Sequence, residues 1–221
     1  MASQCFQPLL YNKAFPTDWE YLTRVRGMPE RSPMGRLIDT IFGFALAIGA
    51  LSLTGTRPQN ISEVLGGLFV FGLSFVILIV IWWDHSDLMS KLTDSKPKII
   101  VLNVTLMFFV AVEPYLLNTL NSSAALFEFT SILYAVDMTF LMGISAVLTH
   151  ILVTEYGGTL SNTQARNYEA NRNFQIFFAC MFLSSVAPIL FTWTIMGVPI
   201  RVYLWLATLA LSIGARTRRK T

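Results

Sequence analysis

The sequence predicts an all-α integral membrane protein, a six-helix bundle whose N and C termini are both cytoplasmic. Apolar residues make up 54% of its 221 residues and charged residues only 13%, about half the charged fraction of a typical soluble domain. Most of the apolar residues fall in stretches long enough to cross a hydrocarbon core, which takes roughly 20 residues in a helix. The six stretches cover about residues 36–53, 64–83, 99–120, 124–153, 174–196 and 202–215.

The basic residues predict the orientation of this bundle. If residue 1 is cytoplasmic, the inner segments are the N-terminal arm, the loops after the second and fourth stretches, and the C-terminal tail. These segments contain every Lys and Arg except Arg57 and Arg201. Cytoplasmic segments carry such an excess of positive charge, so we expect both termini inside. An even number of spans agrees with two basic, cytoplasmic ends.

Three regions follow from this pattern: an arm at residues 1–35, a membrane domain at 36–215 and a basic tail at 216–221. In the arm, residues 17–26 (TDWEYLTRVR) are predicted to form a short interfacial helix. The arm lacks the apolar run of about 7–15 residues that a signal peptide needs. Cys5 lies in the arm and Cys180 in a span, so we expect no disulfide.

Several function classes are excluded by what the sequence lacks. It has no Gly-rich phosphate loop, no pair of histidines at metal-binding spacing and no nucleophile elbow. His85 and His150 are the only histidines, and neither has a second metal ligand nearby in sequence. We therefore expect no enzyme, no metal site and no cofactor. Because the basic residues are spread over loops, they indicate orientation and not nucleic-acid binding.

The first three stretches carry polar residues at the end predicted to be cytoplasmic. Arg36 and Asp39 begin the first stretch, three residues apart on one helical face. The second stretch ends with Trp82 and His85, and the third has Asn103 just inside the same side. These five residues could form one buried network that fixes the first helix against the next two. The alternative is a set of separate, solvated residues at the membrane interface.

The third and fourth stretches each carry a carboxylate. Asp137 lies about 12 residues into its stretch, roughly 18 Å from the outer end, where a charged carboxylate costs at least about 2.5–3.5 kcal/mol. It could be a proton or cation site, or a protonated or hydrogen-bonded packing residue. Glu113 precedes Pro114 towards the outer end of the third stretch. It could attract cations to an outer vestibule, or be an interfacial acid that reaches the headgroups.

Small residues inside the spans are predicted to let neighbouring helices approach closely. They are Gly66, Gly67, Gly72, Ser74, Gly143 and Ser145. The fifth and sixth stretches are apolar but carry no motif that indicates a function.

The second and third stretches resemble those of a known family. Residues 71–86 (FGLSFVILIVIWWDHS) and 102–115 (LNVTLMFFVAVEPY) are similar to the second and third spans of the lysosomal/endosomal potassium channel family, transmembrane protein 175 and its prokaryotic relatives. The shared features are Ser74-Phe75, Trp82-x-x-His85, and Asn103 followed by Pro114 eleven residues later. The resemblance covers roughly residues 36–151.

One feature of the family is missing. In the family's first span an Arg is followed by three residues and then by Phe-Ser-Asp, whereas the corresponding positions after Arg36 are Thr40, Ile41 and Phe42. Asp39, one turn from Arg36, could supply the missing carboxylate.

The resemblance implies a homotetramer in the lipid bilayer, with the first helix of each subunit lining a central pore for potassium or other monovalent cations. It also implies a gate of bulky aliphatic side chains, which closes by dewetting. We expect Ile48 at the narrow point, with Leu51 or Ser52 above it and Ile41, Phe44 and Ala45 continuing the stripe inwards. The alternative is that this stripe packs inside the bundle core.

Three functions remain open from the sequence. The resemblance favours a passive cation channel, most simply for potassium. Asp137 and Glu113 would suit a proton- or ion-coupled transporter, although no internal repeat is visible. The altered triplet and the 35-residue arm would suit a non-conducting scaffold or effector derived from the channels. A short chain with a single repeat fits a prokaryotic plasma membrane.

Overall fold

The computed structural model describes residues 33–55, 60–92, 96–120, 124–187, 190, 193–195 and 198–218. All of them belong to one compact unit, Ser32–Thr221, which is separate from Met1–Arg31. The arm, its predicted interfacial helix and Cys5 therefore lie outside the described residues, while Cys180 is a free, exposed thiol.

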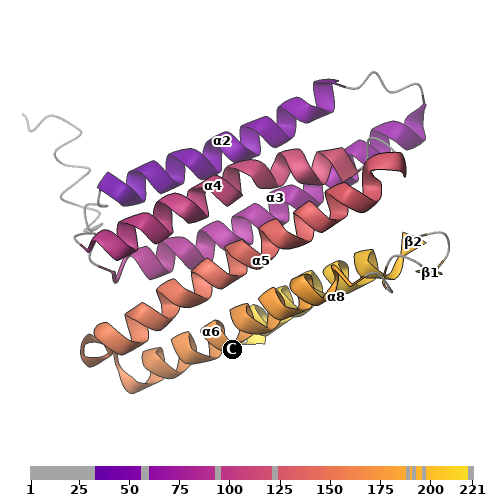
Figure 1. The fold of residues 1–221 in the computed structure, drawn as a ribbon. Helices are drawn as coiled ribbons and strands as arrows, with labels where there is room; N and C mark the ends of the chain where they lie inside the picture. The colour runs from indigo at the N-terminus through magenta and orange to yellow at the C-terminus, as the bar shows by residue number, and fades with distance from the viewer. Residues whose placement is uncertain are drawn as a thin grey trace, which may run out of the picture. The chain divides into compact units, whose positions relative to one another are not determined.

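Helices make up nearly all of this unit (Figure 1). In chain order the elements are α2 (Pro33–Gly55), α3 (Ile61–Met89), α4 (Pro97–Leu120), α5 (Ala124–Glu155), the 3₁₀ turn η1 (Gly157–Thr159), α6 (Asn162–Ser184), β1 (Thr194–Ile195), β2 (Val198–Pro199) and α8 (Ile200–Arg218). The two-residue strands pair antiparallel, with Thr194 opposite Pro199. The predicted all-α class is confirmed apart from this small hairpin.

Within the described residues, four helices are long and apolar enough to cross a membrane: Pro33–Leu51, Val64–Met89, Pro97–Leu120 and Phe127–Glu155. They correspond to the first four predicted stretches. The prediction of a multi-pass membrane protein is thus confirmed, and the full set of six spans stays a prediction.

The predicted bounds of the fifth stretch are wrong. A helix was expected over residues 174–196, but α6 begins at Asn162 and ends at Ser184. Its start is set by a capping box in which the Gln164 N–H donates to Ser161 Oγ at 3.3 Å and the Ser161 N–H donates to Gln164 Oε1 at 3.0 Å. The first half of α6 is polar, so a search for apolar residues detects only its second half.

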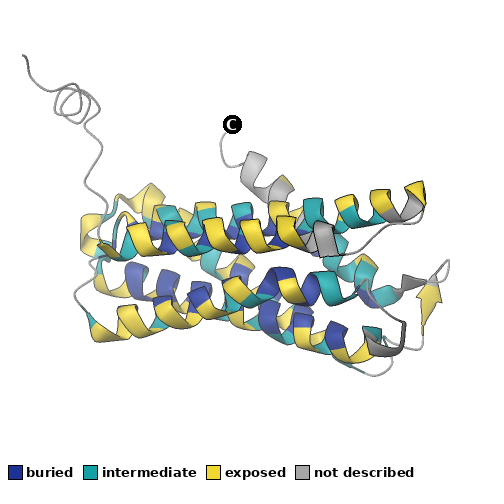
Figure 2. Ribbon diagram, turned by 90° about the horizontal axis from the view of Figure 1, so that it is seen from above, coloured by how far each residue is buried: buried dark blue, intermediate teal, exposed yellow. Residues whose placement is uncertain are grey.

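The core lies where α4 and α5 meet their neighbours. Helix α5 packs against α4 and α6, and α2 packs against α4 and α3. These helices turn mostly apolar side chains inwards, and many exposed positions follow the outer faces (Figure 2). Many of those outer positions are large and apolar, as expected for a surface that faces lipid. Examples are Phe69, Val101, Phe108, Phe129 and Phe177.

Close helix approach occurs at a glycine that was not predicted. A Cβ atom on the buried Gly49 would lie 3.6 Å from both the Phe71 ring and Pro114 Cβ, so α2 comes near α3 and α4 here. At Gly67 a Cβ would lie 3.5 Å from Leu53, in agreement with the prediction for that residue. The other three predicted glycines have open space at this position: Gly66, Gly72 and Gly143.

One end of the bundle gathers basic residues. Lys96 and Lys98, at the start of α4, both donate to the Glu155 carboxylate at the end of α5. At the end of α3, Asp87 accepts from Lys91 at 3.0 Å and from the Tyr168 hydroxyl of α6 at 2.5 Å. We call this the basic end. Its position agrees with the predicted cytoplasmic side, although the orientation itself stays a prediction.

Candidate functional site

Helix α2 has two different faces. Ile38, Phe42 and Ala45 follow a helical period and are almost completely buried against α3 and α4. On the opposite face Phe44 is 65% exposed and Leu51 is 66% exposed. Half of this apolar helix is therefore not used to stabilise its own bundle.

The predicted gate residues are divided between these faces. Phe44, Ile48 and Leu51 share the exposed face, whereas Ile41 is half-buried. Ala45 is fully buried, so it faces the core of its own subunit and not the side of Ile48. This corrects the predicted stripe: Ala45 leaves it because Ala45 belongs to the row that packs on α3 and α4. The Ser52 side chain lies outside the described part of the structure.

The predicted polar network is present in part. Trp82 Nε1 of α3 donates to Asp39 Oδ1 of α2 at 2.8 Å, and His85 is buried close enough to Asp39 for their charges to interact. Asn103 is also buried, but its amide donates to Met89 Sδ at 3.5 Å. Arg36 is exposed at the start of α2. The structure thus joins Asp39 to Trp82 and places Asn103 in a separate contact, while neither ring nitrogen of His85 has a hydrogen-bond partner among the described residues.

Two predicted carboxylates are buried deep in the bundle. Ser74 Oγ of α3 donates to Glu113 Oε2 of α4 at 2.7 Å. Asp137 of α5 lies near enough to Glu113 for their charges to interact, and Tyr134 is within range of both. Among the described residues, neither oxygen of Asp137 has a hydrogen-bond partner, nor has Glu113 Oε1. Glu113 is therefore not the interfacial acid that one reading of the sequence expected.

The sequence prediction missed Arg201. It was expected in an outer loop, yet it is the second residue of α8, with 0% of its surface exposed. Its guanidinium donates to the Ser131 hydroxyl of α5. The sequence shows only an arginine immediately before an apolar run, and an arginine at a helix end usually reaches the membrane interface, so the pattern does not predict its burial.

Titratable side chains do not gather into a metal site in the described ranges. No group of three or more His, Cys, Asp or Glu side chains there could hold a metal ion. His150 instead lies 3.2 Å from the Arg172 guanidinium, measured between His150 Nδ1 and Arg172 Nη1.

Comparisons with known proteins agree with this architecture. Residues 34–114, which include most of α2, all of α3 and most of α4, match the family model described as endosomal/lysosomal potassium channel TMEM175. No curated protein matches the chain.

A similar fold is seen in a crystal structure of a variant of the potassium channel MtTMEM175, in complex with a nanobody–MBP fusion protein. The two structures align with a TM-score of 0.62 and 16% sequence identity, over 89% of this chain and 96% of that chain. The resemblance indicated by the motifs is confirmed: residues 34–114 match the TMEM175 potassium channel family, and the fold is like that of a TMEM175 channel.

Proposed function

We propose that this chain is the subunit of a passive potassium channel, in which α2 of each copy lines a central pore. The observation that carries the proposal is the exposed apolar face of α2. This face lies within the segment that matches the channel family, and the helices that the structure describes leave it uncovered. In the proposed homotetramer it would turn towards a shared axis.

The residues on this face suit a narrow, dry pore. Small residues at Gly43, Ala47 and Ala50 are exposed beside the larger Phe44 and Ile48. Small residues allow helix backbones to approach closely in a membrane. Ile48 would then form a ring at the narrow point. An apolar ring excludes a water column when it is narrow, so ions pass only when the ring widens.

Two alternatives each have a specific feature in their favour. A coupled transporter would use Asp137 and Glu113 as a proton or cation site, since both are buried in the bundle. A non-conducting scaffold would account for Thr40, Ile41 and Phe42 in place of the family's Phe-Ser-Asp. The proposed channel needs neither a second, coupled ion nor a repeat that moves. As part of the same proposal, we place the protein in a prokaryotic plasma membrane.

Potassium flux into liposomes tests the channel and its gate together. The wild-type protein should carry potassium down its gradient without a second ion, and Ile48→Asn should raise this flux several-fold, because a polar ring holds water. Ile176→Asn is the matched control. Ile176 lies on α6 with 47% of its surface exposed, against 44% for Ile48, so it should leave the flux unchanged.

Each alternative has its own outcome in the same assay. Flux that requires a proton or sodium gradient would replace the channel by a coupled transporter. If the folded wild-type protein carries no flux, the result would favour the non-conducting scaffold. If the two substitutions have equal effects, Ile48 is not part of the gate, but the channel proposal still stands.

A further inference from the structure

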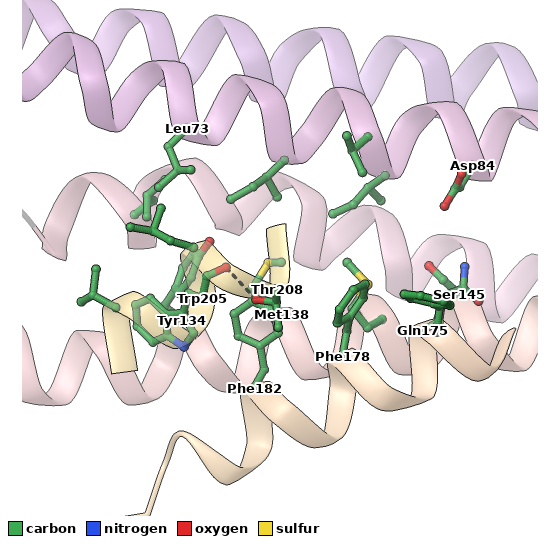
Figure 3. A pocket seen from close by; sticks show the side chains of 18 of the residues that line it. Leu73, Asp84, Tyr134, Met138, Ser145, Gln175, Phe178, Phe182, Trp205 and Thr208 are labelled. Carbon is green, nitrogen blue, oxygen red and sulfur yellow. Dashed lines mark hydrogen bonds between the residues drawn. The ribbon is translucent and has the colours of Figure 1, made fainter. Parts of the chain in front are cut away.

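A cavity of about 120 Å³ lies inside the bundle, lined by side chains of α3, α4, α5, α6 and α8 (Figure 3). Many of these side chains are almost completely buried, so the cavity belongs to the interior and not to the lipid-facing surface. Protein interiors are close-packed, with few voids larger than a water molecule. A cavity of this volume is therefore a candidate binding site, and we call it the inner cavity.

A second, polar cavity connects the inner cavity with the basic end. It has a volume of about 540 Å³ and shares Val80, Asp84 and Asn171 with the inner cavity. Its other lining residues come mainly from the last turns of α3 and the first turns of α6, and most of them are polar. A small molecule can therefore reach the inner cavity from the basic end, without passing through the packed core.

Aromatic rings and thioethers line most of the inner cavity. Tyr134 and Trp205 pack together at the end away from Asp84, with 4.9 Å between their ring centres (Figure 3). Phe178, Met138 and Met142 also line it. Thioether sulfurs make favourable contacts with aromatic rings, and an apolar cavity of about 150 Å³ binds benzene. The volume and the lining thus suit a single aromatic ring.

One buried side chain in the lining has an unused hydrogen-bonding group. Gln175 is 7% exposed, and its amide lies 3.2 Å from Thr149 Oγ1. The single hydrogen of the Thr149 hydroxyl can instead go to the Ser145 carbonyl, at 2.8 Å, so either end of the Gln175 amide can face Thr149. The other end of the amide has no hydrogen-bond partner among the described residues. A hydroxyl group on a ligand would satisfy either end, because it both donates and accepts.

The spacing of the lining residues places the ring site and the polar group one helical turn apart. Phe178 and Gln175 are three residues apart on α6, as Met142 and Ser145 are on α5, and residues at this spacing are neighbours on one helix face. A ring that lies between Phe178 and Met142 can therefore direct a substituent at Gln175.

We propose that the inner cavity binds a small phenolic molecule, with its aromatic ring between Phe178 and Met142 and its hydroxyl group hydrogen-bonded to Gln175. The molecule enters through the polar cavity at the basic end. This site is separate from the exposed face of α2, and it does not depend on whether the protein conducts ions.

Fluorine NMR of the full-length protein in lipid nanodiscs tests the proposal, with 4-fluorophenol and fluorobenzene as the probes. 4-Fluorophenol should bind saturably, above its linear partition into empty nanodiscs. It should also bind about threefold to tenfold more tightly than fluorobenzene, which lacks the hydroxyl group.

Removing the amide tests the hydrogen bond. Gln175→Met keeps the side-chain length and should abolish the preference for 4-fluorophenol. Thr149 still has the Ser145 carbonyl as its acceptor, so this variant should fold. Asn167→Met is the matched control, because Asn167 is another amide of α6 but lines only the polar cavity. It should keep the wild-type preference.

Filling the cavity tests the position of the ring. Met142→Trp should reduce the affinity for both probes, whereas Val147→Trp, at an exposed position on α5, should not. If the tryptophan at position 142 prevents folding, as judged by circular dichroism, Val80→Phe at the junction of the two cavities gives the same test. The proposal is overturned if 4-fluorophenol only partitions, if both probes bind equally, if Gln175→Met keeps the preference, or if filling the cavity changes neither affinity.

Discussion

At the scale of single residues, α3 donates hydrogen bonds to acidic side chains on both of its neighbours. Trp82 donates to Asp39 of α2, and Ser74 donates to Glu113 of α4. Each bond joins residues about forty positions apart in sequence, so each fixes the register of one antiparallel helix pair. Because the alternative is a polar group left without a partner in apolar surroundings, both bonds should be costly to remove.

Removing the Ser74 hydroxyl tests the contact with Glu113. Ser74→Ala should destabilise the protein by about 1–3 kcal/mol, because Glu113 then has no donor on α3. Ser145→Ala is the control, since Ser145 is also buried but donates only to the backbone carbonyl of Leu141. Thermal unfolding in detergent measures both. Equal effects would mean that loss of volume, and not the carboxylate, explains the change.

The indole of Trp82 is tested in the same way. Trp82→Phe keeps an aromatic ring but removes the donor to Asp39, so we expect a loss of about 1–2 kcal/mol. Trp193→Phe, at an exposed position, should cost less than half of that. Potassium flux of the same variants would show whether the contact also matters for conduction. If Trp82→Phe leaves the unfolding temperature unchanged, the bond to Asp39 does not stabilise the protein.

The sequence predicted the acidic residues better than their partners. Asp39, Glu113 and Asp137 stand out because a carboxylate in an apolar stretch is costly. Ser74 and Arg201 do not stand out in the same way, because only the packing of α3 against α4, or of α8 against α5, brings them to their partners.

At the scale of elements, α6 is held to the rest of the bundle by both apolar and polar contacts. Its apolar half packs along α5, while Tyr168 in its polar half bonds Asp87 of α3. Lys91 completes this cluster at the basic end. The polar half of α6 therefore contributes to the fold even though it is not part of a predicted span.

High pH should loosen this cluster. Burial raises the pKa of Tyr168, and its bond to Asp87 raises it further. For Lys91, burial lowers the pKa, but hydrogen bonds to Tyr168 and Asp87 outweigh it and leave the pKa raised. Both groups are thus more protonated in the folded state than in the unfolded one. Their contribution is complete below the unfolded values, about pH 10, and is lost as the pH rises through the raised values.

The measurement is the drop in unfolding temperature between about pH 9 and pH 11, a range that brackets those unfolded values. This drop should be smaller in Tyr168→Phe than in the wild type, because one of the two coupled groups is gone. Tyr115→Phe, at an exposed position on α4, should keep the full wild-type drop. An identical drop in all three proteins would show that the cluster does not titrate with unfolding.

Element positions were predictable where apolar residues alone define a helix. The first four stretches meet this condition and match α2, α3, α4 and α5. Helix α6 does not, because its start depends on the Ser161–Gln164 capping box and its first half is polar. The hairpin of β1 and β2 lies where the fifth stretch was expected to end, and an apolar composition does not distinguish a short extended segment from the end of a helix.

At the scale of the whole molecule, the proposed tetramer predicts specific cross-links. Ile48→Cys, in a background lacking Cys5 and Cys180, should form disulfide-linked dimers in membranes under oxidation. Four copies around an axis bring this position close to itself. Ile176→Cys is the control, because α6 would lie away from that axis. Denaturing gels without reductant separate the two outcomes.

The cross-linking result bears on assembly alone. Cross-links at Ile176 but not at Ile48 would place α6, and not α2, at the interface between copies. A protein that stays monomeric by light scattering in detergent and does not cross-link in membranes would contradict the tetramer.

The fold class and the resemblance to the channel family were predictable from the sequence, because both depend on local patterns: the length of apolar stretches, and motifs within the second and third of them. The choice of which α2 residues face the core was not predictable. Whether a residue such as Ala45 or Ile48 faces the core depends on how α2 is rotated about its own axis, and that rotation is set by contacts with two other helices.

Because α2 has two different faces, selection for folding and selection on the proposed pore act on different residues. Substitutions at Phe44, Ile48 or Leu51 leave the inward row of Ile38, Phe42 and Ala45 intact. In the proposed channel, the dimensions of the pore could therefore change through evolution at little cost to the folding of each protomer. Such freedom would let related proteins differ widely in permeability while keeping the same scaffold.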